Sequence, residues 1–278
     1  MPPSTLLIGL LARVLRDVLA PLIVASLLVV FLTDPARVDT SELVRNSLLM
    51  NTRPIFRVVS PLDAIVNSAI LLATALAAAI AVGVPFGIAY ASSNNRPVRA
   101  LAWSASTFAA SLPAFFWAIA LELLMVVIYF RFGLRLLPIT GFGIDEHLIL
   151  PALALALRPA AYIFRLTATA VEQIRHTDYV RTAIAKGLPD RTLLARHVLP
   201  NAAPNIIAAT LLGARGALSS LVIVEFVYIW DGAGLAFVQA LGGRQFALAS
   251  AIALAFAVGS TMLVLGGELA RSRVKAAP

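Results

Sequence analysis

Polar residues with a regular spacing are concentrated in residues 178–201, between long apolar runs. Residues 172–186 are compatible with a helix, and Gly187 is a suitable stop at its C-terminus. Asp190 can cap a second helix that continues through Arg196. The chemistry that this pattern predicts is recognition by a pair of short helices, because a charged segment between membrane spans must face something other than lipid.

The first predicted helix offers a face for a partner. Tyr179, Ala183 and Lys186 follow at spacings of four and three residues, which places them on the same side. Small and aromatic groups arranged in this way suit the groove of another protein. The alternative is a solvated basic loop that touches anionic lipid headgroups.

No pattern in the chain indicates catalysis. Cysteine is absent, and the serine and aspartate residues form no nucleophile motif. The histidines His147, His176 and His197 are far apart, so no metal site is expected. Lys186 and Lys275 are the only lysines, and neither lies in a G-x-x-x-x-G-K-[ST] phosphate loop. We expect a chain that is not an enzyme and that takes its energy from another chain.

Composition then identifies the elements that must carry this segment. Hydrophobic residues make up 60% of the 278, charged residues 13%, and the mean hydropathy is +0.90, which predicts an all-α integral membrane protein. Apolar runs of about 20 residues predict six membrane helices. Their approximate ranges are 15–33, 64–91, 101–130, 148–170, 203–229 and 246–268. We expect the first to be an uncleaved span, followed by a polar loop over 33–63.

The basic residues predict the orientation. If the N-terminus lies inside the cell, the inner loops and span ends hold about twice as many Lys and Arg residues as the outer ones. Both termini and residues 172–200 are therefore expected in the cytoplasm.

The charged residues inside the predicted spans include four candidates for a functional role: Glu122, Arg158, Arg215 and Glu225. A charge at the bilayer centre costs roughly 2.5–3.5 kcal/mol on insertion scales, so these side chains should face the bundle, water or one another. Structural pairing and lining of a solute pathway are both open to them.

Helix-breaking residues also occur within spans. Pro85, with Gly83 and Gly87 around it, and Pro113 predict kinks, although hinges are an alternative. The small residues over 73–81 predict close helix packing rather than a pore.

The 178–201 segment resembles the cytoplasmic coupling loop of type I ABC importer permeases, whose pattern is Glu-Ala-Ala, three residues, Gly, nine residues, Ile-x-Leu-Pro. Ala183, Gly187, Leu199 and Pro200 stand at the matching positions. The departures are Arg181 and Thr182 for Glu and Ala, and His197 for Ile. With Leu188 and Arg196, these departures resemble the dipeptide/oligopeptide/nickel branch of the family.

A second resemblance covers residues 225–234, which are similar to Glu-x-Val-Phe-x-x-Pro-Gly-Leu-Gly in that family. Here Asp231 stands for Pro and Ala233 for Leu. Within the branch this match favours the B-type subunit, whereas Leu199-Pro200-Asn201 is closer to the C-type. The resemblance runs from about Asp63 to Leu269. It implies an N-terminal helix and extracytoplasmic loop over 1–62 and a type I transmembrane domain over 63–270.

The resemblance implies a multi-pass permease of the bacterial cytoplasmic membrane. Its partners would be a second, C-type permease, two ATPases that bind ATP and Mg, and an extracytoplasmic binding protein. Transport would proceed by alternating access, with the solute, a peptide, a nickel chelate or another small molecule, left open. Contact with the ATPase would fall to a set of seven residues: Tyr179, Arg181, Thr182, Ala183, Lys186, Gly187 and Leu188. Four others would form the scaffold of the loop: Arg196, His197, Leu199 and Pro200.

Two other classes of protein are alternatives. A secondary transporter would use intramembrane carboxylates and an ion gradient, would need no ATPase, and would show a repeat between its halves, which is not evident. An intramembrane enzyme would need a catalytic cluster, and the sequence shows none.

Overall fold

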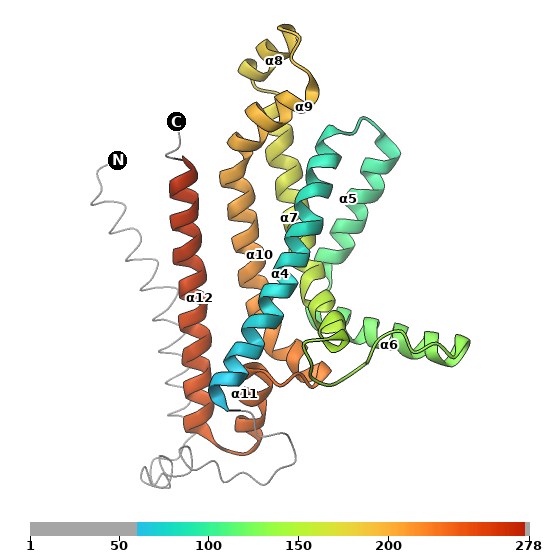
Figure 1. The fold of residues 1–278 in the computed structure, drawn as a ribbon, viewed down its shortest axis with the longest axis vertical. Helices are drawn as coiled ribbons and strands as arrows, with labels where there is room; N and C mark the ends of the chain where they lie inside the picture. Colours follow the sequence, from blue (N-terminus) through green and yellow to red (C-terminus); the bar gives the residue numbers. More distant parts are fainter. Residues whose placement is uncertain (1–59, 276–278) are drawn as a thin grey trace, which may run out of the picture.

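The computed structural model describes residues 60–275, and the regular secondary structure of this part of the chain is helical, without strands (Figure 1). A 3-10 turn, η2 (Glu146–Leu148), precedes α7, and a π-helical turn, η3 (Leu194–Val198), precedes α10. The α-helices are α4 (Pro61–Ser92), α5 (Arg96–Ser111), α6 (Ala114–Phe132), α7 (Ile149–Arg175), α8 (Asp178–Ala185), α9 (Asp190–Leu193), α10 (Leu199–Tyr228), α11 (Ala233–Gly242) and α12 (Phe246–Lys275).

Within residues 60–275, five helical segments are long and apolar enough to cross a membrane. They are Pro61–Ser92, Ala114–Phe132, Glu146–Arg175, Asp190–Tyr228 and Phe246–Leu269. Three of the predicted spans, 64–91, 148–170 and 246–268, fall within these segments, and a fourth, 203–229, passes the end of one by a single residue. The predicted span 15–33 lies outside the described residues.

The prediction of one helix over 101–130 is wrong. The chain forms α5 and α6 instead, and α6 projects sideways from the bundle (Figure 1). Leu112 is extended because the ring of Pro113 disfavours helical backbone in the residue before it. The two helices stay in contact across the break, since the Trp117 indole donates to the Ala109 carbonyl at 3.2 Å. Pro113 thus ends a helix, whereas α4 continues through Pro85.

The sequence also did not indicate α11. This apolar helix has only ten residues, too few to cross a membrane, and it lies between α10 and α12 at the end of the bundle opposite α8 (Figure 1). α10 and its preceding turns are, in contrast, longer than predicted, because helical backbone runs from Asp190 without interruption.

α7 is the central helix and packs against α4, α5, α6 and α10. α4 approaches it closely at two glycines. A Cβ atom on Gly83 would lie 2.8 Å from the Ala160 carbonyl oxygen, and one on Gly87 would lie 2.7 Å from that of Phe164. Ala75 and Ala79, on the small-residue run of α4, are fully buried. The expected close packing is confirmed, and Gly83 and Gly87 have this packing role.

We predict that Gly87→Ala lowers the free energy of unfolding by about 1–3 kcal/mol, because the added methyl group must push α4 away from α7. Thermal unfolding of the purified chain in detergent measures this. Gly216→Ala is the matched control, because no atom lies within 4 Å of the new methyl group and the helix propensity of α10 rises. Equal effects of the two changes would contradict the close contact.

Candidate functional site

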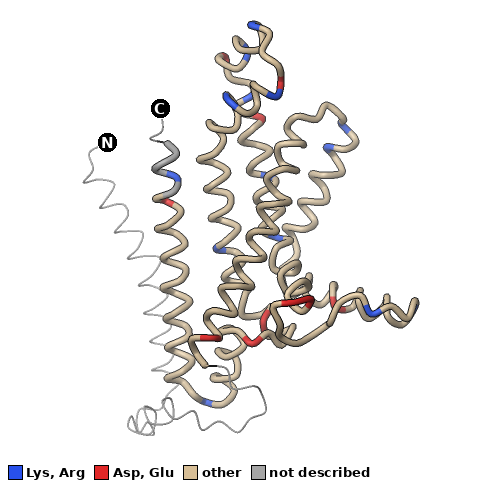
Figure 2. The backbone as a smooth tube through the Cα atoms, viewed as in Figure 1, with Lys and Arg blue, Asp and Glu red and all other residues tan. Residues whose placement is uncertain are grey.

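The segment of α8 and α9 stands at one end of the bundle, beyond the ends of α7 and α10 (Figure 1). Arginine and lysine residues gather at this end, whereas most acidic residues lie toward the other (Figure 2). The exposed basic residues of the segment are Arg181, Lys186, Arg191 and Arg196. A projecting basic segment is therefore present where the sequence predicted one.

The helix predicted over 172–186 is divided in the structure. α7 ends at Arg175, Thr177 is extended, and α8 starts at Asp178. The Thr177 hydroxyl donates to the Ile174 carbonyl at 2.6 Å, and Nδ1 of His176 lies 2.7 Å from the Glu172 carbonyl. These side chains occupy carbonyl groups at the end of α7, which favours ending the helix there.

A small apolar core lies beneath α8. Val180 and Ala183 pack with Leu193, Val198 and Ala202, and the cluster continues onto the end of α7. This core holds α8 against the start of α10, so α8 is supported by the bundle rather than being a free loop.

The prediction that Ala183 is presented together with Tyr179 and Lys186 is wrong. Ala183 is only 8% exposed, because it belongs to this core. Tyr179 and Lys186 are both exposed. The spacing of Val180 and Ala183 could have indicated the buried face, since Val180 is the more apolar anchor.

The outer surface of α8 combines apolar and polar groups. Tyr179 is 46% exposed and Ile184 is 53% exposed. Arg181 and Thr182 are exposed beside them, and Leu188 is half-buried. The sequence analysis did not identify Ile184 as a surface residue. Its exposure is evident only in the structure, where Val180 faces the core. This surface, formed by residues 179, 181, 182, 184 and 186, is called the α8 patch below.

The turn after α8 depends on Gly187, as predicted. Its φ of +77° lies in the left-handed region, which favours glycine. The Leu188 N–H donates to the Ala183 carbonyl at 3.3 Å and so closes the turn. Asp190 does not cap α9, because the N-cap is Pro189. The Asp190 carboxylate instead lies 3.2 Å from the Arg175 guanidinium and ties the turn to α7.

The return to α10 passes through the π-helical turn η3, which includes Arg196 and His197. Pro200 has no N–H for the Arg196 carbonyl, so the α-helical ladder cannot run through this point. The Leu199 N–H donates to the Leu194 carbonyl in the π pattern. The His197 carbonyl accepts from the Asn201 side chain at 2.7 Å and from the Tyr179 hydroxyl at 3.5 Å.

A second polar centre surrounds Glu225 at the opposite end of α10. Its side chain is fully buried, and one carboxylate oxygen accepts from the Ser68 hydroxyl at 2.5 Å. The other oxygen accepts from the N–H groups of Gly234 and Leu235, at 2.7 and 3.2 Å. Glu225 therefore caps the N-terminus of α11, where the helix dipole favours negative charge.

The glycines of residues 225–234 are explained by this cap. A Cβ atom on Gly232 would lie 2.4 Å from the Glu225 carboxylate, and one on Gly234 would lie 2.6 Å from Cα of Val222. The Ser68 hydroxyl completes the junction by accepting from the Ala233 N–H at 2.8 Å. Of the two roles open to Glu225, this arrangement favours the structural one.

The other intramembrane charges are not brought together with Glu225. Glu122 and Arg158 are half-buried, and each has a buried side-chain atom without a hydrogen-bond partner among the described residues, Oε1 and Nε respectively. The Arg158 guanidinium lies 5.8 Å from the centre of the Tyr162 ring. Arg215 is exposed on α10.

Comparison with known protein families identifies the class of protein. Residues 83–275, more than half of the chain, match the family described as "Binding-protein-dependent transport system inner membrane component". The chain belongs to this family. It is thus an integral membrane permease of the ABC transporter type, as the resemblance of residues 178–201 and 225–234 implied.

Relatives of the permease carry different solute names. It is 30% identical over 175 residues to the dipeptide transport system permease protein DppB of Bacillus subtilis, a match that covers 62% of this chain and 54% of DppB. It is 31% identical over 176 residues to the glutathione transport system permease protein GsiC of Salmonella paratyphi A, covering 63% and 56%. It is 29% identical over 196 residues to the putrescine export system permease protein SapB of Escherichia coli, covering 61% of each. The chain thus spans little more than half the length of these relatives.

The histidines of the permease do not approach one another as metal ligands. Within residues 60–275 there is no group of three His, Cys, Asp or Glu side chains that could hold a metal ion. Nδ1 of His147 lies 2.7 Å from the Asp145 carboxylate, which also accepts from the His147 backbone N–H at 2.9 Å. The hydrogen bond from the His147 backbone N–H, and after it the hydrogen bond to the His147 ring, lower the pKa of Asp145 below its ordinary value.

We predict that Glu225→Ala lowers the free energy of unfolding by about 3 kcal/mol, because it leaves a buried hydroxyl and the N–H groups of α11 without their acceptor. Thermal unfolding in detergent measures the loss. Glu122→Ala is the control, since it also removes a carboxylate from a span but breaks no comparable set of bonds. A smaller loss for Glu225→Ala than for the control would contradict the capping role.

Proposed function

We propose that this permease is the solute-translocating subunit of an ATP-driven importer. It would pair with a second permease, two ATPases that bind ATP and Mg, and an extracytoplasmic binding protein. The observation that carries the proposal is the α8 patch, which exposes Tyr179 and Ile184 on a helix that the core beneath it holds in place. Large exposed apolar groups beside polar ones are typical of a surface that meets another protein.

The location of the patch suits contact with an ATPase. α8 is joined to α7 through residues 176–177 and to α10 through α9 and η3. A partner that displaces α8 therefore acts on the ends of two membrane helices at once. α7 is also the helix against which α4, α5 and α6 pack, so its tilting would move much of the described bundle. Alternating access by such tilting is our proposed mechanism.

Charge supports a cytoplasmic location for the patch. The start of α5 and the segment of α8 and α9 lie at one end of the bundle and carry exposed arginines at 96, 181, 191 and 196 (Figure 1). The end of α6 and the α11–α12 connection lie toward the opposite end and carry those at 131, 135 and 244. The starts of α4, α7 and α11 also lie toward that opposite end, and acidic residues stand at or just before each of them: Asp63, Asp145, Glu146 and Asp231 (Figure 1). An excess of Lys and Arg marks the cytoplasmic side of a membrane protein. We accordingly propose insertion in the bacterial inner membrane with both termini in the cytoplasm.

The proposed solutes are peptides or similar small molecules. This class rests on the names of relatives, which refer to dipeptides, glutathione and putrescine. Glu122 and Arg158 are the described charges that we propose as candidates for lining the pathway, because each keeps a buried polar atom without a hydrogen-bond partner among residues 60–275. Glu225 is left out of this proposal, because its carboxylate is occupied by the α11 cap.

We predict that a cysteine introduced by Ile184→Cys cross-links to the ATPase in the assembled complex. The chain has no native cysteine, so the introduced thiol is unique in this subunit. The thiol is labelled with a maleimide that carries a photoreactive group, which inserts into C–H bonds of any chain in contact. The yield of the illuminated adduct, read by gel electrophoresis, should change between the nucleotide-free state and the state trapped with ATP and vanadate. Such a change would show that the α8 patch moves relative to the ATPase during turnover.

Ala183→Cys is the control, because that position is buried in the core beneath α8 and should react poorly. Absence of a cross-link at position 184 in an active reconstituted complex would contradict the contact with the ATPase. Solute uptake into vesicles by this chain alone, driven by an ion gradient, would instead support a secondary transporter.

A further inference from the structure

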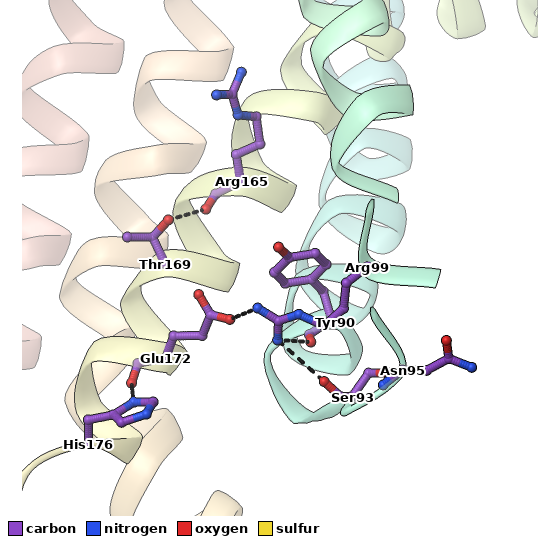
Figure 3. A network of polar contacts seen from close by, with 8 residues as sticks. All are labelled: Tyr90, Ser93, Asn95, Arg99, Arg165, Thr169, Glu172 and His176. Carbon is purple, nitrogen blue, oxygen red and sulfur yellow. Dashed lines mark hydrogen bonds and ion pairs between the residues drawn. The ribbon is translucent and has the colours of Figure 1, made fainter. Parts of the chain in front are cut away.

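Two charged residues at the α8 end of the bundle stand at electrostatically unfavourable helix ends. Arg99 lies in the first turn of α5, where the helix dipole is positive, and Glu172 lies in the last turn of α7, where it is negative. Their side chains meet, since a guanidinium nitrogen of Arg99 lies 2.5 Å from a carboxylate oxygen of Glu172 (Figure 3). This ion pair offsets the unfavourable interaction of each charge with the dipole of its own helix.

Arg99 connects a third helix as well. Its other terminal nitrogen donates to the carbonyls of Tyr90 and Ser93, at 3.2 and 3.3 Å, at the end of α4 (Figure 3). Carbonyl groups in the last turn of a helix lack partners within it, so the guanidinium serves as a cap. A single side chain therefore holds the ends of α4, α5 and α7 together.

Aromatic rings extend the contact along the same helix faces. The Arg99 guanidinium lies 4.3 Å from the centre of the Tyr90 ring, and that of Arg165 lies 4.7 Å from the centre of a Trp103 ring. The Tyr90 ring also contacts the rings of Trp103 and Phe164, at 5.7 and 5.5 Å. The set Tyr90, Arg99, Trp103, Arg165 and Glu172 is called the three-helix clamp below.

The clamp matters because α5 has little else to hold it. Ser106 is the only buried residue of α5. Apolar burial therefore attaches this helix weakly, and its position on α7 depends on the clamp. α5 leads directly through the Leu112-Pro113 break into the projecting helix α6.

The clamp is also next to residues 178–201, which are proposed to contact the ATPase and are called the coupling segment below. Glu172 lies one turn before the end of α7, six residues from the start of α8. On the same last turn, Arg175 donates to the Ser92 hydroxyl at 3.3 Å and pairs with Asp190 at the start of α9. The last turn of α7 thus contacts the α4–α5 connection and the coupling segment at the same time.

We propose that the three-helix clamp transmits displacement of α8 to α5 and α6, with Arg99 as the positioning residue for this coupling. This inference rests on the proposed function, since it specifies how motion imposed on α8 reaches the outer helices. Arg99 contacts neither solute nor nucleotide in this role. Its removal should leave α8 able to move and α5 unable to follow.

The test uses spin-label pairs in the reconstituted complex, in a chain without native cysteine. Labels on Ile184→Cys, Ala105→Cys and Leu254→Cys report α8, α5 and α12, and all three positions are exposed. Distances are measured without nucleotide and after trapping with ATP and vanadate. In the otherwise unaltered chain, the 184–254 and 105–254 distances should both shift, while the 105–184 distance stays constant.

In Arg99→Glu the 184–254 shift should persist while the 105–254 shift is lost. The population in which α5 follows α8 should fall about tenfold, within the range typical of coupling between sites. The double variant Arg99→Glu with Glu172→Arg should restore it, because the pair is re-formed with opposite signs. Arg96→Glu is the matched control. It makes the same charge change on α5, at an exposed residue whose side chain makes no hydrogen bond or ion pair with the described residues.

The outcomes separate the two proposals. A 105–254 shift that survives in Arg99→Glu would overturn the clamp, as would a 105–184 distance that changes in the chain with Arg99 intact. Loss of both shifts in Arg99→Glu but not in the double variant would assign the pair to folding of the whole end, again against the clamp. If neither distance to position 254 responds to nucleotide in the chain with Arg99 intact, the proposed ATP-driven function itself fails.

Discussion

The rest of the structure depends on the close approach of α4 to α7. Gly83 and Gly87 let the backbone of α4 reach the carbonyl groups of Ala160 and Phe164, a distance that any side chain would increase. Helices in a membrane cannot rely on water to drive them together, so close van der Waals contact has to hold them. Because α7 also packs against α5, α6 and α10, its contact with α4 determines where both ends of the bundle lie.

Polar groups then act at the two ends of this packed centre. At one end Glu225 caps α11 and binds Ser68 of α4. At the other, Arg99 caps α4 and pairs with Glu172 of α7. In both places a charged side chain supplies partners for backbone groups that a helix end leaves open. The same physical requirement gives a rigid junction near α11 and a connection among α4, α5 and α7 next to the coupling segment.

In the coupling segment, local sequence determines the turns and tertiary packing determines which side chains are exposed. Its turn at Gly187 follows from the backbone freedom of glycine and was predicted from the sequence. The change to π-helical backbone over Leu194–Val198 follows from the missing N–H of Pro200, and the sequence analysis did not predict it. The face that α8 presents was not visible in the sequence, because Tyr179, Ala183 and Ile184 could each face outward on an isolated helix. The core of Val180, Leu193 and Val198 places Ala183 inside and Ile184 outside.

The sequence alone determined the class of protein and its family, four of the spans, and the polar segment between two of them, because apolar length and motif spacing are local properties of the chain. It also showed four candidate intramembrane charges, without distinguishing a cap from a pathway residue. Only the tertiary structure divided 101–130 at Pro113, revealed α11, and joined Glu225 to Ser68 and Arg99 to Glu172. These features depend on side chains from distant helices meeting, and no pattern within one helix contains that information.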